Sequence, residues 1–425
     1  MKKLILLIFI IFFAGEAVSQ QWIVYKKNNS GLPDNNILKI TVDSNNIIWI
    51  GTSMGGLVRF DRSTWTVWDT TNSPLKCNGR INNLIVDRYN NKWLSNFMNG
   101  YNSAGIFKFD GVNWVNYNVN NSGLCYNVVL SFDFENNGAM WIATPKCLSK
   151  FINNNWEHFD TLNSNIHSQN IFNVAVEGHI KWLSTYGRGI SKFNDTTFVM
   201  YDMSNSGLSS NYIRTIVIDR FGNKWFGTYQ GGLDKFNSQT NQWTVYYDDG
   251  IPSPFIDCVL IDKKDRVWVG TANQYLGVLT DTGWVVFNET NSPIPGDYVK
   301  TLALDRYGNL WIGTIDGIAV YNETGIIGIN ESNGNYVPTD FYLYQNYPNP
   351  FNPVTKINFA IQKQGLVTLK VYDMLGREVA ALVNEFKQAG YYSIDFNASG
   401  LSSGIYFYRL QANDFTDIKK MVLIK

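Results

Sequence analysis

The stretch Ile218-Asp-Arg-Phe-Gly-Asn-Lys-Trp-Phe-Gly-Thr228 decides the fold of this 425-residue chain. Two apolar segments flank a Gly-Asn pair, and such a pair is typical of the tight turn of a β-hairpin. The same pattern returns around seven tryptophans, which are Trp49, Trp93, Trp141, Trp182, Trp225, Trp268 and Trp311. Successive tryptophans lie 44, 48, 41, 43, 43 and 43 residues apart. A period near 43 residues, built from short strand-like segments, indicates a repeat protein of the propeller or solenoid type.

Each repeat contains four strand-like pieces, which is the content of one propeller blade. A segment related to Trp-x-Val-Tyr precedes each core tryptophan, beginning at Trp22, Trp65, Trp114, Trp156, Phe198, Trp243 and Trp284. The last repeat stops at Tyr321 without a fourth strand, whereas Trp22-Ile-Val-Tyr25 stands spare at the start. We therefore predict an all-β chain in which a seven-bladed propeller over residues 21–324 is closed by its N-terminal strand. Closure of this kind removes exposed sheet edges.

The charge balance and the composition exclude several classes of protein. The chain has 35 Lys and Arg against 35 Asp and Glu, so its net charge is zero, and it lacks the basic stripe of a nucleic-acid-binding protein. Aromatic residues make up 15% of the chain and are accompanied by 35 glycines, which argues against a disordered chain and against a helical bundle. We expect no nucleic-acid partner.

The N-terminus has the three parts of a secretory signal. Lys2 and Lys3 are basic, residues 4–13 are all apolar, and residues 17–19 provide small side chains for cleavage before Gln20. Ten apolar residues are too few to cross a hydrocarbon layer of about 30 Å. We predict a cleaved signal peptide over residues 1–19, no transmembrane segment, and an exported, soluble, monomeric protein. A signal that is not cleaved is the alternative.

The composition changes after the last repeat. Residues 325–339 are rich in Gly, Asn and Ser, which is typical of a linker. Three prolines then stiffen the segment Tyr347-Pro-Asn-Pro-Phe-Asn-Pro353. Short alternating segments follow at 355–361, 367–372, 391–396, 404–410 and 419–423. This spacing predicts a small β-sandwich as a second domain over residues 340–425.

The repeat has a recognisable sequence of its own. The copy that ends at Thr228 and the copy Leu304-Asp-Arg-Tyr-Gly-Asn-Leu-Trp-Ile-Gly-Thr314 resemble two-component-regulator propeller repeats. This resemblance implies a propeller like those that form the extracytoplasmic sensors of hybrid histidine kinases, which often respond to glycan fragments. No kinase or response-regulator segment follows the repeats, so we expect the signalling half of that family's function to be absent.

Four blocks of sequence, at 347–350, 371–377, 401–406 and 419–425, distinguish the C-terminal region. In this order they resemble the C-terminal sorting domain of the type IX (Por) secretion system. The resemblance assigns the sorting motif to Tyr347, Pro348, Asn349, Pro350, Gly376, Arg377, Gly404, Tyr406, Lys419 and Lys420. It implies a Gram-negative, Bacteroidota-like host, the type IX machinery as a partner, and a product that is secreted or held at the outer cell surface.

Two groups of residues that could carry chemistry are better explained as scaffold. His158, His167 and His179 fall on an outer strand, an inter-blade loop and a hairpin turn, so we expect no two of them to meet and no metal site. One acidic residue precedes each core tryptophan, at Asp43, Asp87, Glu135, Glu177, Asp219, Asp262 and Asp305. Their spacing is not that of a calcium-binding loop, so we predict that each accepts backbone N–H groups of its own turn. No cofactor is expected.

The four cysteines leave the disulfide pairing open. Export permits disulfides, and Cys77 and Cys125 each lie 16 residues before a core tryptophan, in equivalent loops of adjacent blades. Cys147 follows the core strand of the third repeat. The pairs Cys77–Cys125 and Cys125–Cys147 are therefore both open. Cys258 lies in an apolar strand and is expected to be a buried thiol.

The positions that differ between repeats predict the ligand-binding surface. In four-stranded blades, the loop that enters a blade and the loop after its core strand share one face around the central channel. These loops carry Arg80, Tyr126, Tyr186, Arg188, Tyr212, Tyr229, Gln230, Phe255, Tyr275 and Tyr298. Flat aromatic rings with hydrogen-bond donors at their edges suit a sugar ring, so we predict a glycan or protein ligand on this face. The alternative is that these aromatic residues only reflect the high aromatic content of the chain.

We therefore predict a secreted or cell-surface propeller that binds a ligand without catalysis. No Ser-His-Asp arrangement, carboxylate pair or phosphate-binding glycine loop can be placed from the sequence, so no catalytic residue is predicted. Because some propellers are lyases or glycosidases, a secreted carbohydrate-active enzyme is one alternative. A structural or adhesive surface component is the other.

Overall fold

The computed structural model describes residues 21–425 apart from 99–101, 248–249, 274, 327–328, 330–340 and 347–348. The predicted signal peptide, residues 1–19, and most of the predicted linker, residues 325–339, lie outside the described residues. Within the described ranges the regular structure is β-strand, apart from one 3-10 turn at Cys77–Gly79. No helix in this part of the chain is long and apolar enough to cross a membrane.

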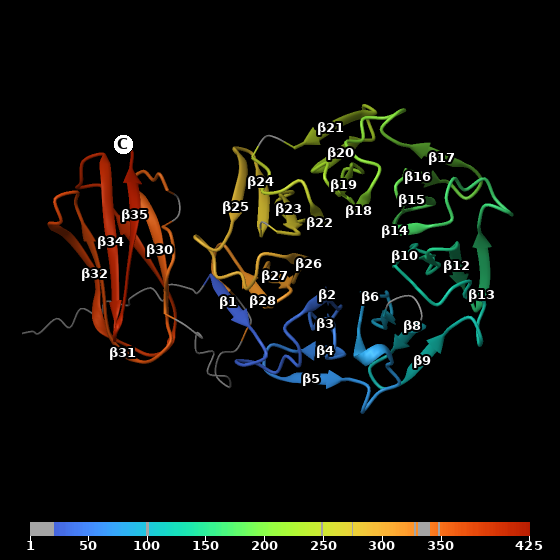
Figure 1. Ribbon diagram of the computed structural model, residues 1–425, viewed down its shortest axis with the longest axis horizontal. Coiled ribbons are helices and arrows are strands. Elements are labelled where there is room, and N and C mark those ends of the chain that lie inside the picture. The colour runs from blue at the N-terminus through green and yellow to red at the C-terminus, as the bar shows by residue number, and fades with distance from the viewer. Residues whose placement is uncertain are drawn as a thin grey trace, which may run out of the picture.

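In the described residues, seven four-stranded antiparallel sheets follow one another around a ring (Figure 1). We number them as blades 1 to 7 in chain order. The innermost strands are β2 (Ile37–Val42), β6 (Asn83–Val86), β10 (Ser131–Phe134), β14 (Ile171–Glu177), β18 (Ile213–Ile218), β22 (Ile256–Ile261) and β26 (Val299–Leu304). The second strands, which contain the core tryptophans, are β3 (Ile48–Thr52), β7 (Lys92–Met98), β11 (Met140–Ala143), β15 (Ile180–Thr185), β19 (Lys224–Thr228), β23 (Val267–Thr271) and β27 (Leu310–Thr314).

The outer half of each blade completes the repeat. The third strands are β4 (Leu57–Phe60), β8 (Asn102–Phe109), β12 (Leu148–Ile152), β16 (Gly189–Phe193), β20 (Leu233–Asn237), β24 (Leu276–Thr280) and β28 (Gly317–Tyr321). The outermost strands of blades 1 to 6 are β5 (Trp65–Trp68), β9 (Trp114–Tyr117), β13 (Asn155–Phe159), β17 (Phe198–Tyr201), β21 (Gln242–Tyr246) and β25 (Gly283–Phe287). The outermost strand of blade 7 comes from the other end of the propeller sequence.

That strand is β1 (Trp22–Tyr25), which pairs antiparallel with β28 so that Trp22 faces Tyr321 and Tyr25 faces Ile318. All four residues of β1 are buried, and they alternate between two neighbours because strand side chains point to opposite faces. Trp22 packs in the cluster around Trp268 in blade 6, whereas Ile23 and Tyr25 pack in the cluster that contains Phe60 of blade 1. The closure predicted from the sequence is confirmed.

The acidic residue before each core tryptophan holds the first hairpin of its blade. Asp219 Oδ1 accepts the N–H groups of Phe221 and Asn223 in its own turn, at 2.9 and 2.8 Å. Its other oxygen accepts the indole N–H of Trp225 at 3.1 Å. In all seven blades the indole Nε1 donates to this acid, at distances from 2.7 to 3.3 Å.

The predicted bonds from backbone N–H groups of the turn are present at the five aspartates. At the two glutamates the contacts are side-chain ones: Glu135 accepts the amide N–H of Asn137 at 2.7 Å, and Glu177 accepts the ammonium of Lys224 at 2.7 Å. The indole bond in all seven blades was not predicted.

The C-terminal unit consists of two sheets around one apolar core. One sheet has the order β29 (Tyr342–Leu343), β30 (Val354–Ile361) and β33 (Gly390–Asn397), and the other has the order β32 (Glu378–Lys387), β31 (Gly365–Tyr372), β34 (Gly404–Ala412) and β35 (Phe415–Leu423). Phe359 and Phe396 from the first sheet and Leu369 and Leu410 from the second belong to the same buried cluster. The expected sandwich is present, and it contains two strands, β29 and β32, that were not predicted. We keep 340–425 as the proposed bounds of this domain and 21–324 as those of the propeller.

Part of the predicted sorting motif lies at the start and end of this unit. Tyr347 and Pro348 lie outside the described residues. Asn349 precedes Pro350 through a cis peptide bond, and its Oδ1 accepts the backbone N–H of Val422 at 2.9 Å. Lys419 and Lys420 lie on β35, and the carbonyl oxygen of Lys420 accepts the side-chain N–H of Gln345 at 2.6 Å and that of Asn349 at 3.4 Å. The first and last sorting blocks therefore contact each other.

The two middle sorting blocks occupy turns and a strand start. Gly376 has a φ of +77° in the turn between β31 and β32, a conformation that favours glycine. Arg377 closes that turn, since its Nε donates to Asp373 Oδ2 at 2.7 Å. Gly404 begins β34, and the buried Tyr406 donates its hydroxyl hydrogen to the carbonyl oxygen of Ser402 at 2.8 Å. These residues have clear structural roles within the sandwich.

Candidate functional site

The loops that enter the blades and the loops that follow the second strands lie together, which agrees with the sequence-based prediction. In blade 5 the backbone N–H of Tyr229 donates to the carbonyl oxygen of Tyr212 at 2.9 Å. In blade 6 the same bond joins Ala272 to Phe255 at 3.2 Å. We call the surface formed by these loops the loop face. The opposite surface, formed by the hairpins between first and second strands, is the hairpin face.

A pocket of about 610 Å³ opens on the loop face at blades 4 and 5. It is lined by Phe172, Thr185, Tyr186, Tyr212, Ile213, Arg214, Tyr229 and Gln230. Tyr186, Tyr212 and Tyr229 are 63%, 48% and 40% exposed, so their rings present apolar faces to solvent. The rings of Tyr186 and Tyr212 meet edge to face, with centroids 5.6 Å apart. Four residues predicted from the sequence, namely these three tyrosines and Gln230, are thereby brought together.

Glycine and threonine residues set the positions of these loops. Gly187 has a φ of +71°, and a Cβ there would lie 3.1 Å from the ring of Tyr212. A larger residue would therefore be strained and would crowd this tyrosine. In the next blade the hydroxyl of Thr228 donates to the carbonyl oxygen of Gly232 at 2.9 Å and accepts the N–H of Gly231 at 2.9 Å. These bonds fix the turn that carries Tyr229 and Gln230.

A polar cluster joins the pocket to the channel mouth. The guanidinium carbon of Arg214 lies 5.3 Å from the ring centroid of Tyr229, and its Nε lies 3.5 Å from Asp257 Oδ1. Burial raises the pKa of Tyr298, and a hydrogen bond to Asp257 raises it further, so this phenol keeps its proton at neutral pH. Phe255 packs edge to face on Tyr229, with centroids 5.0 Å apart. Two more predicted residues thus belong to this cluster without lining the pocket: Phe255 packs on Tyr229, and Tyr298 bonds to Asp257.

The central channel forms a second cavity of about 360 Å³ along the innermost strands. Phe172 and Arg214 line both this channel and the loop-face pocket, so the two spaces adjoin. Burial lowers the pKa of Lys39 and raises that of Asp133 on the channel wall. Cys258 also lies on this wall, half-buried, and burial raises the pKa of its thiol. Protonated thiols are poor nucleophiles, so Cys258 is suited to packing.

The other predicted loop residues lie apart from the pocket. Arg80 donates through Nη1 to Ser53 Oγ at 2.9 Å in blade 1. The ring of Tyr126 lies 4.4 Å from the ammonium of Lys146, and the hydroxyl of Tyr275 donates to Glu289 Oε2 at 3.3 Å. Arg188 is exposed and is not among the residues that line the pocket. The predicted loop set therefore divides into one cluster at blades 4 to 7 and four residues outside it.

Four residues that line the pocket or the channel were not predicted from the sequence, namely Phe172, Arg214, Asp257 and Lys300. They occupy equivalent positions near the start of the innermost strands, where the strand register shifts in blades 4 to 7. Blades 1 and 3 carry Leu38 and Leu130 there. The change from leucine to three charged residues is a signal that a comparison of strand positions, and not only of loop positions, detects in the sequence.

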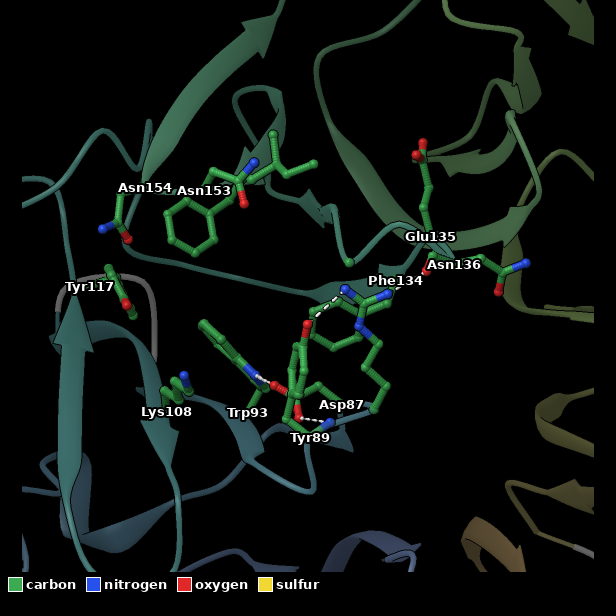
Figure 2. Close-up of a pocket in the computed structure, with 14 residues that line it drawn as sticks. Asp87, Tyr89, Trp93, Lys108, Tyr117, Phe134, Glu135, Asn136, Asn153 and Asn154 are labelled. Atoms are coloured by element: carbon green, nitrogen blue, oxygen red, sulfur yellow. Dashed lines mark hydrogen bonds between the residues drawn. The ribbon is translucent and has the colours of Figure 1, made fainter.

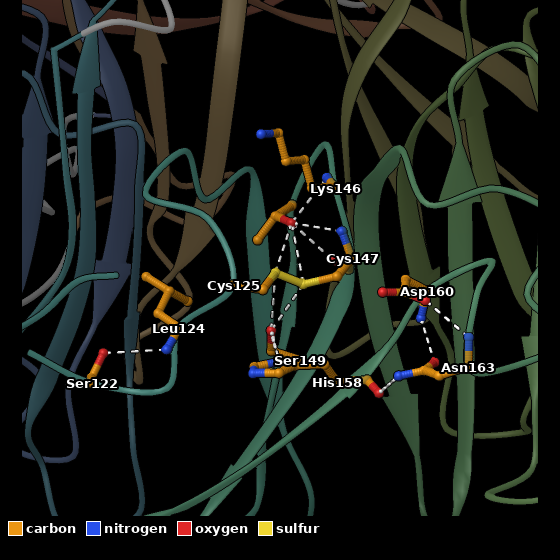
Figure 3. The surroundings of a disulfide bond; sticks show 10 residues. Ser122, Leu124, Cys125, Lys146, Cys147, Ser149, His158, Asp160 and Asn163 are labelled. Carbon is orange, nitrogen blue, oxygen red and sulfur yellow. Dashed lines mark hydrogen bonds between the residues drawn. A yellow bond between two sulfur atoms is a disulfide. The ribbon is translucent and has the colours of Figure 1, made fainter. Parts of the chain in front are cut away.

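A disulfide joins Cys125 to Cys147, with Cα atoms 6.7 Å apart (Figure 3). Of the two pairings that the sequence left open, this one is present, and it ties the loop that enters blade 3 to the loop after β11. His158 lies beside it on the outermost strand, with Nδ1 3.0 Å from Ser149 Oγ. The two sulfurs and one imidazole nitrogen lie within 4.8 Å of one another. Sulfurs bonded to each other are not the thiolates that a metal requires.

Comparison with protein families gives two matches. Residues 345–425 match the family described as a secretion system C-terminal sorting domain. Residues 31–54 and 293–316 match the two component regulator propeller family. No curated protein matches the chain. The chain thus combines regulator-type propeller repeats with a secretion sorting domain, as both resemblances in the sequence indicated.

Three similar solved structures share the propeller fold. PorZ, a surface component of the type IX secretion system of Porphyromonas gingivalis, is 17% identical, with a TM-score of 0.59 over 93% of this chain and 60% of that chain. The extracellular domain of the hybrid two component system BT3049 from B. thetaiotaomicron is also 17% identical, with a TM-score of 0.61 over 95% of this chain and 60% of that chain. Virginiamycin B lyase from Staphylococcus aureus is 12% identical, with a TM-score of 0.54 over 71% of this chain and 99% of that chain. The chain spans 60% of the length of the first two proteins, and identities this low show the fold alone.

Proposed function

We propose that this chain is a secreted or cell-surface propeller that binds a glycan, without catalysis, in the loop-face pocket of blades 4 and 5. The observation that carries the proposal is the convergence of Tyr186, Tyr212 and Tyr229 with Arg214 on one open pocket of about 610 Å³. The tyrosine rings offer apolar platforms for the C–H face of a sugar. The phenol hydroxyls, the guanidinium and the amide of Gln230 offer hydrogen bonds to sugar hydroxyls.

Two features, the C-terminal sorting domain and the disulfide of blade 3, support a location outside the cytoplasm. The sorting domain at 345–425 marks the chain for secretion. The disulfide Cys125–Cys147 in blade 3 suits an oxidising compartment outside the cytoplasm. From the sorting motif we infer that the type IX machinery of a Bacteroidota-like Gram-negative host is the partner of the C-terminal domain.

Replacing two of the pocket tyrosines, Tyr212→Ala with Tyr229→Ala, is expected to weaken glycan binding at least tenfold. Each substitution removes a stacking platform from the pocket while leaving the buried strands intact. The measurement is binding of the full chain to a glycan array, followed by titration of the best glycan. Phe221→Ala is the matched control, because Phe221 is an exposed aromatic residue of the same blade on the hairpin face. It should bind as the unaltered chain does.

Three outcomes would contradict the proposal in different ways. Failure to bind any glycan removes the sugar assignment. Equal binding by the double variant places the ligand elsewhere. Turnover of a bound glycan assigns the chain to the secreted lyases or glycosidases instead, a test for which incubation with the best array glycan and product analysis suffices.

A further inference from the structure

The hairpin face contains a repeated binding site for an ammonium group. Between successive blades lies a cleft that holds the acid–tryptophan pair of the earlier blade. In three clefts a lysine from the following blade, placed directly before that blade's core tryptophan, enters the cleft. Lys92 Nζ lies 4.4 Å from the ring centroid of Trp49, Lys181 Nζ lies 4.2 Å from that of Trp141, and Lys224 Nζ lies 5.0 Å from that of Trp182.

The contacts of Lys181 and Lys224 define this site. Lys181 donates to Glu135 Oε1 at 3.1 Å, to the carbonyl oxygen of His179 at 2.9 Å, and to the carboxylate of Asp195. Lys224 donates to Glu177 Oε1 at 2.7 Å, to the carbonyl oxygen of Gly222 at 2.6 Å, and to Ser238 Oγ at 2.8 Å. Each ammonium therefore has the same four partners. They are an indole face, the acid bonded to that indole, the carbonyl oxygen two residues before the lysine, and a side chain from the turn after the third strand.

Arginines supply the cation in two further clefts. Arg62 of blade 1 donates through Nη2 to Asp305 Oδ2 at 3.0 Å in the cleft after blade 7. Arg266 donates through Nε to Asp262 Oδ2 at 2.8 Å, and its guanidinium carbon lies 5.4 Å from the ring centroid of Trp268. Arg266 thus lies over an indole and beside its acid, whereas the guanidinium carbon of Arg62 lies 5.2 Å from the ring centroid of Tyr307. A cation beside the acid and over an aromatic ring is the arrangement that these clefts share, as expected for desolvated cation–π and charge-assisted contacts.

The cleft between blades 2 and 3 has counterparts of these partners but no such lysine. Its acid is the shorter Asp87 in place of a glutamate, and Asp87 Oδ2 also accepts the side-chain N–H of Asn91 at 2.8 Å. Met140 occupies the lysine position directly before Trp141. Asp87 Oδ2 accepts the indole N–H of Trp93 at 2.8 Å, Gly138 lies two residues before Met140, and Asn153 occupies the turn position that Asp195 holds in the next blade. In the described residues no lysine or arginine nitrogen forms an ion pair with Asp87. A cavity of about 380 Å³ lies here instead, lined by Asp87, Trp93, Gly138 and Asn153 among others (Figure 2).

The charged side chains nearby do not replace the missing ammonium. Lys108 lies 5.5 Å from the ring centroid of Trp93, but it is the counterpart of Lys150, which shares Trp141 with Lys181 at 5.1 Å. One indole ring can therefore contact two cations at once, a lysine of its own blade and a lysine of the next blade. Glu135 is bound to Trp141 and Lys181 of the following cleft. Arg88 lines the exposed side of the cavity, and its guanidinium is bound to the turn of blade 3. Its Nη1 donates to the carbonyl oxygen of Asn136 at 2.7 Å, and its Nη2 donates to that of Asn137 at 3.3 Å.

We propose that this cavity binds the primary alkylammonium group of an external ligand, either a free amine or a lysyl side chain. The ammonium takes the place that Lys181 and Lys224 fill in their clefts, beside Asp87, the carbonyl oxygen of Gly138 and the amide oxygen of Asn153. The alkyl chain lies along the aromatic lining, which includes Tyr117, Phe134 and Phe151. The volume lies within the range of small-molecule pockets, about 300–1,000 Å³. This site is separate from the loop-face pocket, so its test is independent of the proposed glycan function.

Saturation-transfer NMR on the full chain tests the proposal with two probes, n-butylammonium and Nα-acetyl-lysine methylamide. We expect transfer to at least one amine and none to n-butanol, which has the same alkyl chain without the charge. Met140→Lys supplies the internal ammonium of the neighbouring clefts and should weaken amine binding at least tenfold. Met140→Leu, which keeps the position apolar, should bind as the unaltered chain does. Val267→Lys makes the same change in the cleft between blades 5 and 6 and should leave binding unchanged.

The outcome identifies the source of the amine or overturns the proposal. Transfer to butylammonium alone assigns a free amine, and transfer to the lysine derivative assigns a lysyl side chain. Transfer to neither amine, equal transfer to n-butanol, or equal amine binding by Met140→Lys would overturn it. If Met140→Lys fails to fold, Asn153→Gly on the exposed turn provides the test. Asn153 has a φ of +49°, which glycine adopts without strain, so this change removes one acceptor and should weaken binding several-fold. Unchanged amine affinity in Asn153→Gly would count against the site.

Discussion

Removing residues 21–25 is expected to lower the free energy of unfolding of the propeller by more than about 5 kcal/mol. The strand β1 inserts four buried side chains between blades 6 and 1, and burial of each large apolar side chain contributes about 1.5–3 kcal/mol. Its removal also exposes the edge of β28, which makes the protein prone to edge-to-edge association. Denaturant unfolding followed by circular dichroism, together with light scattering, measures both effects.

Single substitutions separate the strand's packing from its backbone pairing. Tyr25→Ala should cost about 3–5 kcal/mol, because the Tyr25 ring is fully buried and contacts Phe60, Trp65 and Trp311. Thr66→Ala, on the exposed side of the outermost strand of blade 1, is the control and should change stability by less than about 0.5 kcal/mol. An unchanged unfolding midpoint after removal of residues 21–25 would show that β1 does not close the ring.

The substitution Asp234→Asn is expected to make the protein more stable at pH 8 by up to about 4 kcal/mol, with almost no effect at pH 4. Asp234 lies on β20 and is completely buried, with Oδ2 accepting the backbone N–H of Ser209 at 2.9 Å. Its Oδ1 has no hydrogen-bond partner among the described residues. Burial raises the pKa of this carboxyl to about 7, and the bond from Ser209 only partly offsets the shift.

The direction of the pH dependence follows from this raised pKa. Between about pH 4 and pH 7 the folded protein keeps a proton that the unfolded chain releases, so the stability contributed by Asp234 is full below that range and is lost as pH rises through it. The asparagine variant has no such proton to lose. Unfolding free energies of both proteins at pH 4, 6 and 8 give the comparison. A difference between them that does not change with pH would contradict the buried, protonated state of Asp234.

The propeller was predictable because the same pattern of a core tryptophan and strand-like segments occurs seven times in the sequence. The spacing of the core tryptophans indicates the length of one blade. The unmatched segment Trp22–Tyr25 indicates how the ring closes, because the last repeat is the one sheet that lacks a fourth strand. The strand β32 was missed because Val383 is its one buried residue, so the alternation that marks a half-buried strand is weak there. An edge strand with two exposed faces gives little sequence signal.

The candidate sites were predictable only in part. Tyr186, Tyr212 and Tyr229 could be assigned to one face from loop position, but their convergence depends on which blades are neighbours and on Gly187 and Gly231 in the turns. The cavity beside Asp87 gave no signal as a motif. Met140 stands where the neighbouring clefts have a lysine, and the importance of that position emerges only from the contacts of Lys181 and Lys224 in the folded structure.

The delivery of a ligand-binding ring to the cell exterior is tested most directly by localisation in a Bacteroidota host that has the type IX machinery. The full chain is compared with a variant that lacks residues 345–425, the segment matched by the sorting family. We expect the full chain at the outer surface or in the medium, and the truncated chain, still folded, in the periplasm. Equal delivery of both chains to the exterior, or retention of the full chain inside the cell, would contradict the account.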